Sequence, residues 1–293
     1  MSTHAPPTQP VGRSRTVEAN GLRLHFLEYG AAHLPALVIL PGITSPAVTW
    51  EFVALELASE FRVLTMDVRG RGLSERGRSY AREELARDVA EALAALELDR
   101  PAVLGHSAGA RIAAAFGALY PALRGPLVVA DPPLSGPGRA PYPTPVEAFV
   151  ESLRLARAGA SADDMRPFFP TWTQEQLELR AAWLGTCDET AVVETHRLFH
   201  EEDFFEDWVR LHSPTLFVWG GAGPVVGETG AAEVAAANPA AEVAVLPGAG
   251  HMLPWDDLAG FLAIVRPFLA RTLHGRGAPG GADPLPETDG GAR

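Results

Sequence analysis

The sequence predicts an α/β protein in which helices flank a mostly parallel, eight-stranded sheet and a helical cap is inserted after the sixth strand. Two observations predict this fold class. Short apolar runs alternate with helical stretches from Thr16 to about Ala130, a pattern typical of a parallel sheet covered on both faces. The alternation stops after Asp131, where a Pro-rich loop and helical stretches follow, and it resumes at Pro214.

The expected elements follow one another in a simple order. Among the strands expected before the cap, the clearest runs are LRLHFLEYG, ALVILPG, RVLTMD, AVLGHS and PLVVAD, and the first pair of strands is compatible with antiparallel pairing. The helical runs between them are EFVALELASEF, ARDVAEALAALEL and the alanine-rich run after Ser107. The cap contains TPVEAFVESLRLARAG, TQEQLELRAAWLG and ETAVVETHRLFHEEDFFEDWVR. After the cap come PTLFVWGG, a helix at Ala231–Ala237, AEVAVLP and a last helix at Trp255–Leu273.

These elements divide the chain into segments. The first part of the core is expected at 16–132, the helical cap at 133–212 and the second part of the core at 213–273. The N-terminal segment 1–15 is expected to be flexible. The segment 274–293 is predicted to be a disordered tail, because GRGAPGGADPLPETDGGAR is rich in Gly and Pro and contains no aromatic residue.

Composition favours a small-molecule partner. The formal net charge is −12 and all 24 basic residues are arginine, so binding to nucleic acid or to an anionic membrane is not expected. The single cysteine, Cys187, excludes an internal disulfide. The start MSTHAPPTQPVGRSR lacks the apolar core of a signal peptide. A cytoplasmic protein is therefore expected, and the sequence indicates no particular oligomeric state.

A serine lies between two glycines where an apolar strand gives way to an alanine-rich helix, in the stretch AVLGHSAGARIAAAFGALYP. Gly105 and Gly109 allow backbone to pass close to backbone, so Ser107 is predicted to project its hydroxyl from a nucleophile elbow. The alternative is a helix start with Ser107 as its N-cap. A base and an oxyanion hole elsewhere in the chain decide between the two.

The expected base is His251, in the loop GAGHMLPWDD after the last strand. Parallel sheets place reactive groups at the carboxyl ends of their strands, and the only other histidine in such a loop is His106, beside the serine. His196 and His200 form an i, i+4 pair on a cap helix. Arg197 stands where the HExxH motif has glutamate, so a helix face is predicted there and no metal site.

The oxyanion hole is predicted to use two backbone N–H groups. One belongs to Ala108, directly after the serine, and the other to Ile43 in the loop PGITS that follows Leu40. The segment DVRGRGLS, which contains Asp67 and Arg69, is predicted to form a structural turn.

The motifs GHSAG, DVRGRGLS and GAGH, in this order, resemble those of the α/β-hydrolase fold family over residues 16–273. In that family the triad acid commonly follows the next-to-last strand, where this chain has WGGAGPVV, with Gly223 in place of the aspartate. Two explanations remain: a non-catalytic ligand-binding homologue, or an acid from another strand end. Asp131 ends LVVAD and is favoured. Glu228 begins a helix and could equally cap it, whereas Asp256 and Asp257 lie too near His251 in sequence and suit the first turn of a helix.

A closer resemblance supports Asp131. The segments PGITSPAVTW, DVRGRGLS, DPPLSGPGRAPYP and HMLPWDDLAGF are similar to those of the N-formylmaleamate deformylases of nicotinate degradation. The resemblance implies a Ser107, Asp131 and His251 triad that hydrolyses N-formylmaleamate to maleamate and formate, without a cofactor. It also implies a formyl-serine intermediate. A carboxylesterase or C–C bond hydrolase on the same triad is the alternative activity.

Such a substrate carries a carboxylate, whose natural partner is a buried arginine. The candidates are Arg69, Arg71, Arg111 and Arg139, of which Arg111 and Arg69 are the predicted substrate-binding residues. Arg111 lies one helical turn after the serine, where a structural ion pair would explain it equally well.

Overall fold

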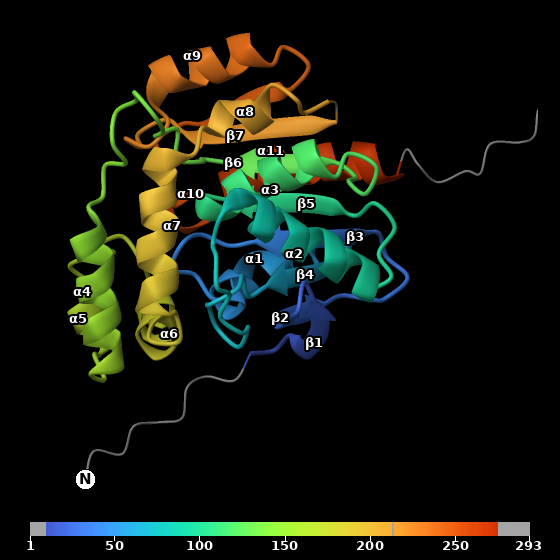
Figure 1. The fold of residues 1–293 in the computed structure, drawn as a ribbon. Coiled ribbons are helices and arrows are strands. Elements are labelled where there is room, and N and C mark those ends of the chain that lie inside the picture. Colours follow the sequence, from blue (N-terminus) through green and yellow to red (C-terminus); the bar gives the residue numbers. More distant parts are fainter. Residues whose placement is uncertain (1–9, 213, 275–293) are drawn as a thin grey trace, which may run out of the picture.

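A computed structural model of the chain describes residues 10–212 and 214–274. One eight-stranded sheet forms its centre, with strand order β1-β2-β4-β3-β5-β6-β7-β8 (Figure 1). β1 pairs antiparallel with β2, β2 pairs antiparallel with β4, and all other pairs are parallel. The strands are β1 (Arg13–Ala19), β2 (Leu22–Tyr29), β3 (Ala36–Leu40), β4 (Arg62–Met66), β5 (Ala102–His106), β6 (Leu127–Ala130), β7 (Thr215–Gly220) and β8 (Glu242–Leu246).

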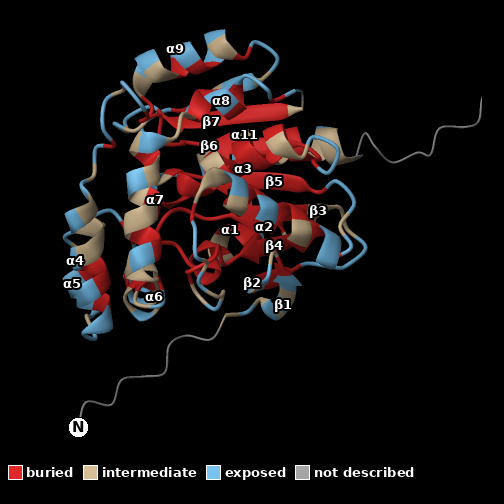
Figure 2. Ribbon diagram, in the orientation of Figure 1, coloured by how far each residue is buried: buried red, intermediate tan, exposed pale blue. Residues whose placement is uncertain are grey.

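Two layers of helices cover the sheet. Apolar side chains of α2 (Arg82–Ala95), α3 (Ala108–Leu119), α8 (Phe204–Trp208) and α9 (Gly227–Ala237) belong to the hydrophobic core on one face. The core on the other face includes η1 (Ala47–Trp50), α1 (Glu51–Leu57), α10 (Leu253–Asp256) and α11 (Leu258–His274). β3 is apolar throughout because both of its faces are buried. Leu37 and Ile39 pack in one core, whereas Val38 and Leu40 pack in the other. Figure 2 shows the central strands β3 to β7 buried, with exposed residues on the outer faces of the helices.

The cap follows β6 and consists of α4 (Val146–Arg157), α5 (Ala162–Met165), α6 (Gln174–Leu184) and α7 (Glu189–Glu201), which lie together at one side of the sheet (Figure 1). Buried side chains of these helices, such as Leu153, Leu177 and Val192, continue the core on the α1 and α11 face. α8 falls within the expected cap range 133–212, yet Phe204 and Trp208 pack in the opposite core with α3 and α9. The last part of that range therefore lies on the sheet.

The ends of the fold differ in detail from the expected boundaries. β1 begins at Arg13, so residues 13–15 belong to a strand and not to a flexible segment. Their pairing with β2 supplies the backbone hydrogen bonds that order them. The expected last helix is divided into α10 and α11. Residues 1–9 and 275–293, including nearly all of the predicted disordered tail, lie outside the described residues. None of the helices in the described ranges has the length and apolar character needed to span a membrane.

Candidate active site

Ser107 sits in the turn between β5 and α3 with φ +56°, a conformation that costs strain in a residue other than glycine. A Cβ atom at Gly105 would lie 2.1 Å from the carbonyl oxygen of Gly109, and one at Gly109 would lie 1.9 Å from the carbonyl oxygen of Leu40. Both positions therefore exclude every larger residue. Ser107 makes no side-chain cap hydrogen bond to α3, so its hydroxyl is not used as an N-cap.

A chain of two hydrogen bonds connects the serine to a buried carboxylate. His251 Nε2 lies 2.9 Å from Ser107 Oγ, and His251 Nδ1 lies 2.6 Å from Asp131 Oδ2. With the Nδ1 proton donated to the carboxylate, Nε2 is free to accept the hydroxyl proton. The structure thus brings together the three residues that the sequence singled out.

The backbone at the ends of β6 and β7 fixes Asp131. Its N–H donates to Val218 O at 2.8 Å, and its Oδ1 accepts the N–H of Gly220 at 3.0 Å. Asp131 is 1% exposed and has φ +47°. A Cβ atom at Gly223 would lie 3.0 Å from the backbone nitrogen of His251, so this chain keeps the β7 loop tight against the histidine while β6 presents the carboxylate.

The other acidic candidates serve local structure. Asp256 Oδ2 accepts the N–H of Gly250 at 2.9 Å, and Asp257 Oδ1 accepts the N–H of Gly260 at 2.9 Å. Glu228 is an exposed residue in the first turn of α9.

The predicted oxyanion loop lies beside the serine. A Cβ atom at Gly42 would lie 3.5 Å from Ser107 Cβ, and Ala108 opens α3 directly after the serine. Arg71 Nε donates to Ile43 O at 3.0 Å, and Arg180 Nη1 donates to Thr44 O at 2.5 Å. Two guanidinium groups therefore hold consecutive carbonyls of this loop and orient its peptide planes.

His106 supports the base from behind. Its Nε2 donates to His251 O at 2.8 Å, and its ring centroid lies 5.1 Å from that of His251. Burial lowers the pKa of His106 to about 3, with the nearby His251 acting in the same direction. His106 is thus a neutral donor that fixes the loop of His251 at any working pH.

Tyr142 also reaches the site, and the sequence analysis did not select it. Its hydroxyl lies 3.3 Å from His251 Nε2, where it can donate to the unprotonated nitrogen. Burial raises the pKa of Tyr142, so the phenol stays protonated. Its only signal in the sequence is an aromatic residue within the Pro-rich segment DPPLSGPGRAPYP.

The cap histidine pair positions that segment. His200 Nε2 accepts the N–H of Tyr142 at 3.1 Å, while His200 Nδ1 donates to His196 O at 3.0 Å. His196 Nε2 donates to Thr144 O at 2.9 Å. These two histidines therefore hold the backbone of Tyr142 and Thr144 in place.

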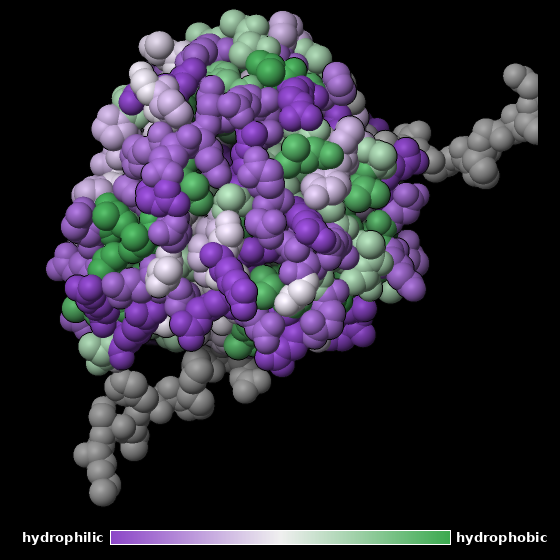
Figure 3. All heavy atoms as spheres, viewed as in Figure 1, coloured by the Kyte–Doolittle hydropathy of each residue, from purple (hydrophilic) through white to green (hydrophobic). Residues whose placement is uncertain are grey.

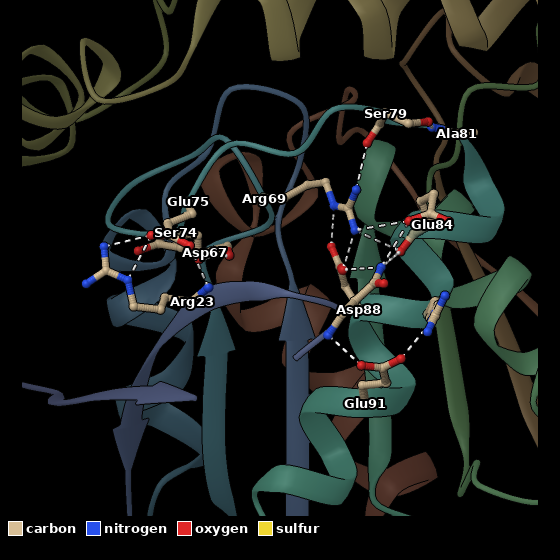
Figure 4. Close-up of polar contacts among 12 residues, drawn as sticks. Arg23, Asp67, Arg69, Ser74, Glu75, Ser79, Ala81, Glu84, Asp88 and Glu91 are labelled. Carbon is tan, nitrogen blue, oxygen red and sulfur yellow. Dashed lines mark hydrogen bonds and ion pairs between the residues drawn. The ribbon is translucent and has the colours of Figure 1, made fainter. Parts of the chain in front are cut away.

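The arginines chosen from the sequence are engaged elsewhere, and neither Arg69 nor Arg111, the predicted substrate-binding residues, is among those that line the cavity at Ser107. Arg69 makes a buried two-pronged pair with Asp88 and donates to Ser79 O at 2.7 Å (Figure 4). Arg111 donates to the carbonyls of Pro133, Ser135 and Glu202. Sequence spacing placed both near the strand ends, but their side chains turn to these buried acceptors.

The two remaining candidates do not line the cavity at Ser107 either. Arg139 pairs at the surface with Glu233. Arg71 lies behind the oxyanion loop, where Nη2 donates to Thr195 Oγ1 at 2.8 Å. Arg71 is therefore a support of the loop.

A cavity of about 250 Å³ opens over Ser107. That volume is below the roughly 300–1,000 Å³ of typical ligand pockets, so it suits a small substrate. Its lining is largely apolar and comes from the core and the cap: Gly42, Ile43, Thr44, Ser45, His106, Ser107, Tyr142, Thr144, Ala148, Phe149, Ser152, Phe168, Phe169, Arg180, His251 and Met252. Arg180, on α6, is the arginine that the sequence analysis missed.

A second Ser-His-Asp chain lies away from this cavity. Ser14 Oγ is 2.8 Å from His25 Nε2, and His25 Nδ1 is 2.7 Å from Asp67 Oδ2. Ser14 belongs to the regular strand β1 and not to an elbow at a helix N-terminus. Asp67 also accepts the N–H groups of Ala47 and Leu73, which ties the β4 end together. The dyad of His25 and Asp67 is thus structural, and Figure 4 shows Asp67 in its turn.

The family model for the alpha/beta hydrolase fold matches residues 35–258. The chain belongs to this family of hydrolases, as its motifs indicated. It is 47% identical over 263 residues to N-formylmaleamate deformylase of Pseudomonas putida, a match that covers 88% of this chain and 96% of that protein.

Two further comparisons agree with this family. A crystal structure of an N-formylmaleamic acid deformylase variant from Pseudomonas putida S16 superposes with a TM-score of 0.82 at 42% identity, covering 86% of this chain and 100% of that one. The 2-(acetamidomethylene)succinate hydrolase of Mesorhizobium japonicum is 25% identical over 258 residues, which are 81% of this chain and 88% of that protein. The predicted fold class is confirmed.

Proposed function

We propose that this chain is a serine hydrolase that cleaves N-formylmaleamate to maleamate and formate. The observation that carries the proposal is the hydrogen-bonded chain from Ser107 through His251 to Asp131 at a small cavity. The 47% identity to N-formylmaleamate deformylase supports the choice of substrate.

In the acylation step, Ser107 Oγ attacks the formyl carbon while His251 Nε2 takes the hydroxyl proton. The negative charge that develops on the formyl oxygen is stabilised by the N–H groups of Ile43 and Ala108. Asp131 keeps the imidazole in the tautomer with the proton on Nδ1 and stabilises the imidazolium.

Collapse of the tetrahedral intermediate breaks the bond from the formyl carbon to nitrogen. His251 delivers its Nε2 proton to that nitrogen, and maleamate leaves. The nitrogen lies between two carbonyl groups, so its departure as an amide is easier than the loss of a free amine. Formyl-serine remains on Ser107.

In the deacylation step, His251 takes a proton from water, whose oxygen attacks the formyl carbon. The second tetrahedral intermediate expels Ser107 Oγ, which regains its proton from His251. The product is formic acid, which loses a proton to the solvent and leaves as formate. The two steps together consume one water and return the protein residues to their starting state. The chemistry therefore uses these side chains, the backbone donors and one water.

A substrate panel tests the proposal against the alternative hydrolases. We expect kcat/KM to be highest for N-formylmaleamate, lower for an aryl acetate and lowest for a vinylogous diketone. A preference for the aryl ester or the diketone would assign the triad to an esterase or a C–C bond hydrolase.

Fluorophosphonate labelling of Ser107 is the companion measurement, and an unlabelled, folded protein would indicate a ligand-binding homologue. A cytoplasmic location stays a prediction from the sequence.

A further inference from the structure

We propose that Arg180 binds the substrate carboxylate and thereby selects N-formyl amides that carry an anionic group on the leaving side. The proposal rests on the proposed function, because it names the part of the cavity that holds the maleamate half. It concerns a residue of the cap, whereas the triad belongs to the core.

Arg180 lines the cavity over Ser107, although it is only 3% exposed. Nη1 donates to Thr44 O at 2.5 Å and Nη2 donates to Thr44 Oγ1 at 2.6 Å. Its Nε is buried without a hydrogen-bond partner in the described part of the chain. The guanidinium therefore keeps donor capacity after its protein contacts are made.

The guanidinium of Arg180 lies 4.8 Å from the centre of the Phe169 ring, a cation–π contact, but it has no carboxylate partner in the described part of the chain. No carboxylate of the described ranges lies within ion-pair distance of it, and the lining of the cavity includes neither Asp nor Glu. Burial lowers its pKa to about 10, so the group is still cationic at neutral pH. A buried cation without a counterion is costly, and a bound carboxylate would supply both the opposite charge and an acceptor for Nε.

The other buried arginines near the site differ from Arg180. Arg69 is paired with Asp88. Arg71 uses all three guanidinium nitrogens, since Nε donates to Ile43 O, Nη1 to Arg69 O and Nη2 to Thr195 Oγ1. Arg180 is therefore the group with capacity for a ligand, and Arg71 is its matched control, because it holds the neighbouring carbonyl of the same loop.

A purely structural role predicts a different behaviour. If Arg180 only held Thr44, its loss would disturb the adjacent Ile43 N–H and slow every substrate alike. If it also binds the carboxylate, its loss lowers kcat/KM further for substrates that have one than for substrates that lack it. The ratio of kcat/KM for N-formylmaleamate to that for its methyl ester separates the two roles.

The experiment measures this ratio in wild type, Arg180→Met, Arg180→Lys and Arg71→Met, with circular dichroism as the folding control. We expect wild type to prefer the acid, and we expect Arg180→Met to lower kcat/KM about 10- to 100-fold further for the acid than for the ester. Arg180→Lys should retain part of the preference, since it keeps the charge but not the planar fork. Arg71→Met should lower kcat/KM for both substrates and preserve the ratio between them.

An unchanged ratio in Arg180→Met would overturn the proposal. A binding measurement keeps it testable apart from activity: the dissociation constants of maleamate and of neutral maleamide are compared in Ser107→Ala and in Ser107→Ala with Arg180→Met. We expect Arg180→Met to weaken the binding of maleamate and to leave the binding of maleamide unchanged. Equal weakening of both ligands, or of neither, would contradict carboxylate binding. Absence of formate release by wild type would instead contradict the proposed function.

Discussion

Asp131 uses one carboxylate for two partners, because Oδ1 accepts the N–H of Gly220 and Oδ2 meets His251 Nδ1. Asparagine tolerates the positive φ of this position, so Asp131→Asn should fold. We expect kcat to fall by up to about ten-thousand-fold, because an amide NH₂ facing Nδ1 favours the wrong imidazole tautomer. The measurement is kcat for formate release with thermal unfolding as the control. Wild-type activity in the folded variant would exclude Asp131 and direct attention to Glu228.

Because His106 is buried, we expect the free energy of unfolding to depend on pH. Its pKa in the folded state is lowered to about 3 by burial, whereas an unfolded histidine titrates near 6.5. Between these values the unfolded state binds a proton that the folded state does not. The contribution of His106 to the free energy of unfolding is therefore fully present above about pH 6.5 and is lost as the pH falls. His106 contributes a slope of up to about 1.4 kcal/mol per pH unit in that window.

His106→Gln should therefore flatten the dependence of the free energy of unfolding on pH between about pH 6.5 and 4. Urea unfolding at several pH values measures the slope. An unaltered slope in the variant would mean that His106 does not contribute this proton uptake. Glutamine retains a donor for His251 O, which limits other effects of the change.

At the scale of elements, the elbow depends on the close approach of backbones. A Cβ at Gly105 would meet the Gly109 carbonyl at 2.1 Å, whereas one at Gly42 would meet Ser107 Cβ at an ordinary 3.5 Å. We expect Gly105→Ala to lower the free energy of unfolding by about 1–3 kcal/mol or more and Gly42→Ala to leave it nearly unchanged. Urea unfolding compares the two. Equal stability of both variants would contradict the packing described for the elbow.

The sequence was sufficient for elements whose signals are local. The glycines around Ser107, the apolar strands and the loop of His251 all carry patterns that backbone geometry requires, and the structure places them as expected. Arg69 does not line the cavity at Ser107, because its guanidinium pairs with Asp88, and sequence spacing does not reveal that pair. Tyr142 and Arg180 were missed for the converse reason. Both side chains line the cavity because of how the cap packs on the core, and the residues around them in the sequence do not predict that packing.

At the scale of the whole molecule, the cap and the core share buried contacts. One hydrophobic core runs from Trp50 of η1 to Leu177 and Val192 of the cap. Arg180 donates to Thr44 across the same boundary. On the face seen in Figure 3, hydrophobic residues form small patches interrupted by hydrophilic ones, which fits apolar surface that is buried mainly within the chain.

We therefore expect the cap and the core to unfold in one cooperative transition. Burying the boundary couples the two parts, so neither keeps its core without the other. Calorimetry tests this expectation by comparing the calorimetric and van't Hoff enthalpies, which should agree. Two resolved transitions, with tryptophan fluorescence changing in only one, would show that the cap unfolds separately.

The central claim is that Ser107 and its partners release formate from an N-formyl amide. The most direct measurement is the amount of formate and maleamate formed from N-formylmaleamate by wild type and by Ser107→Ala, each shown to be folded. The account predicts equimolar products from wild type and a rate lower by several orders of magnitude in the variant. Formate release by Ser107→Ala at the wild-type rate, or none from wild type, would contradict it.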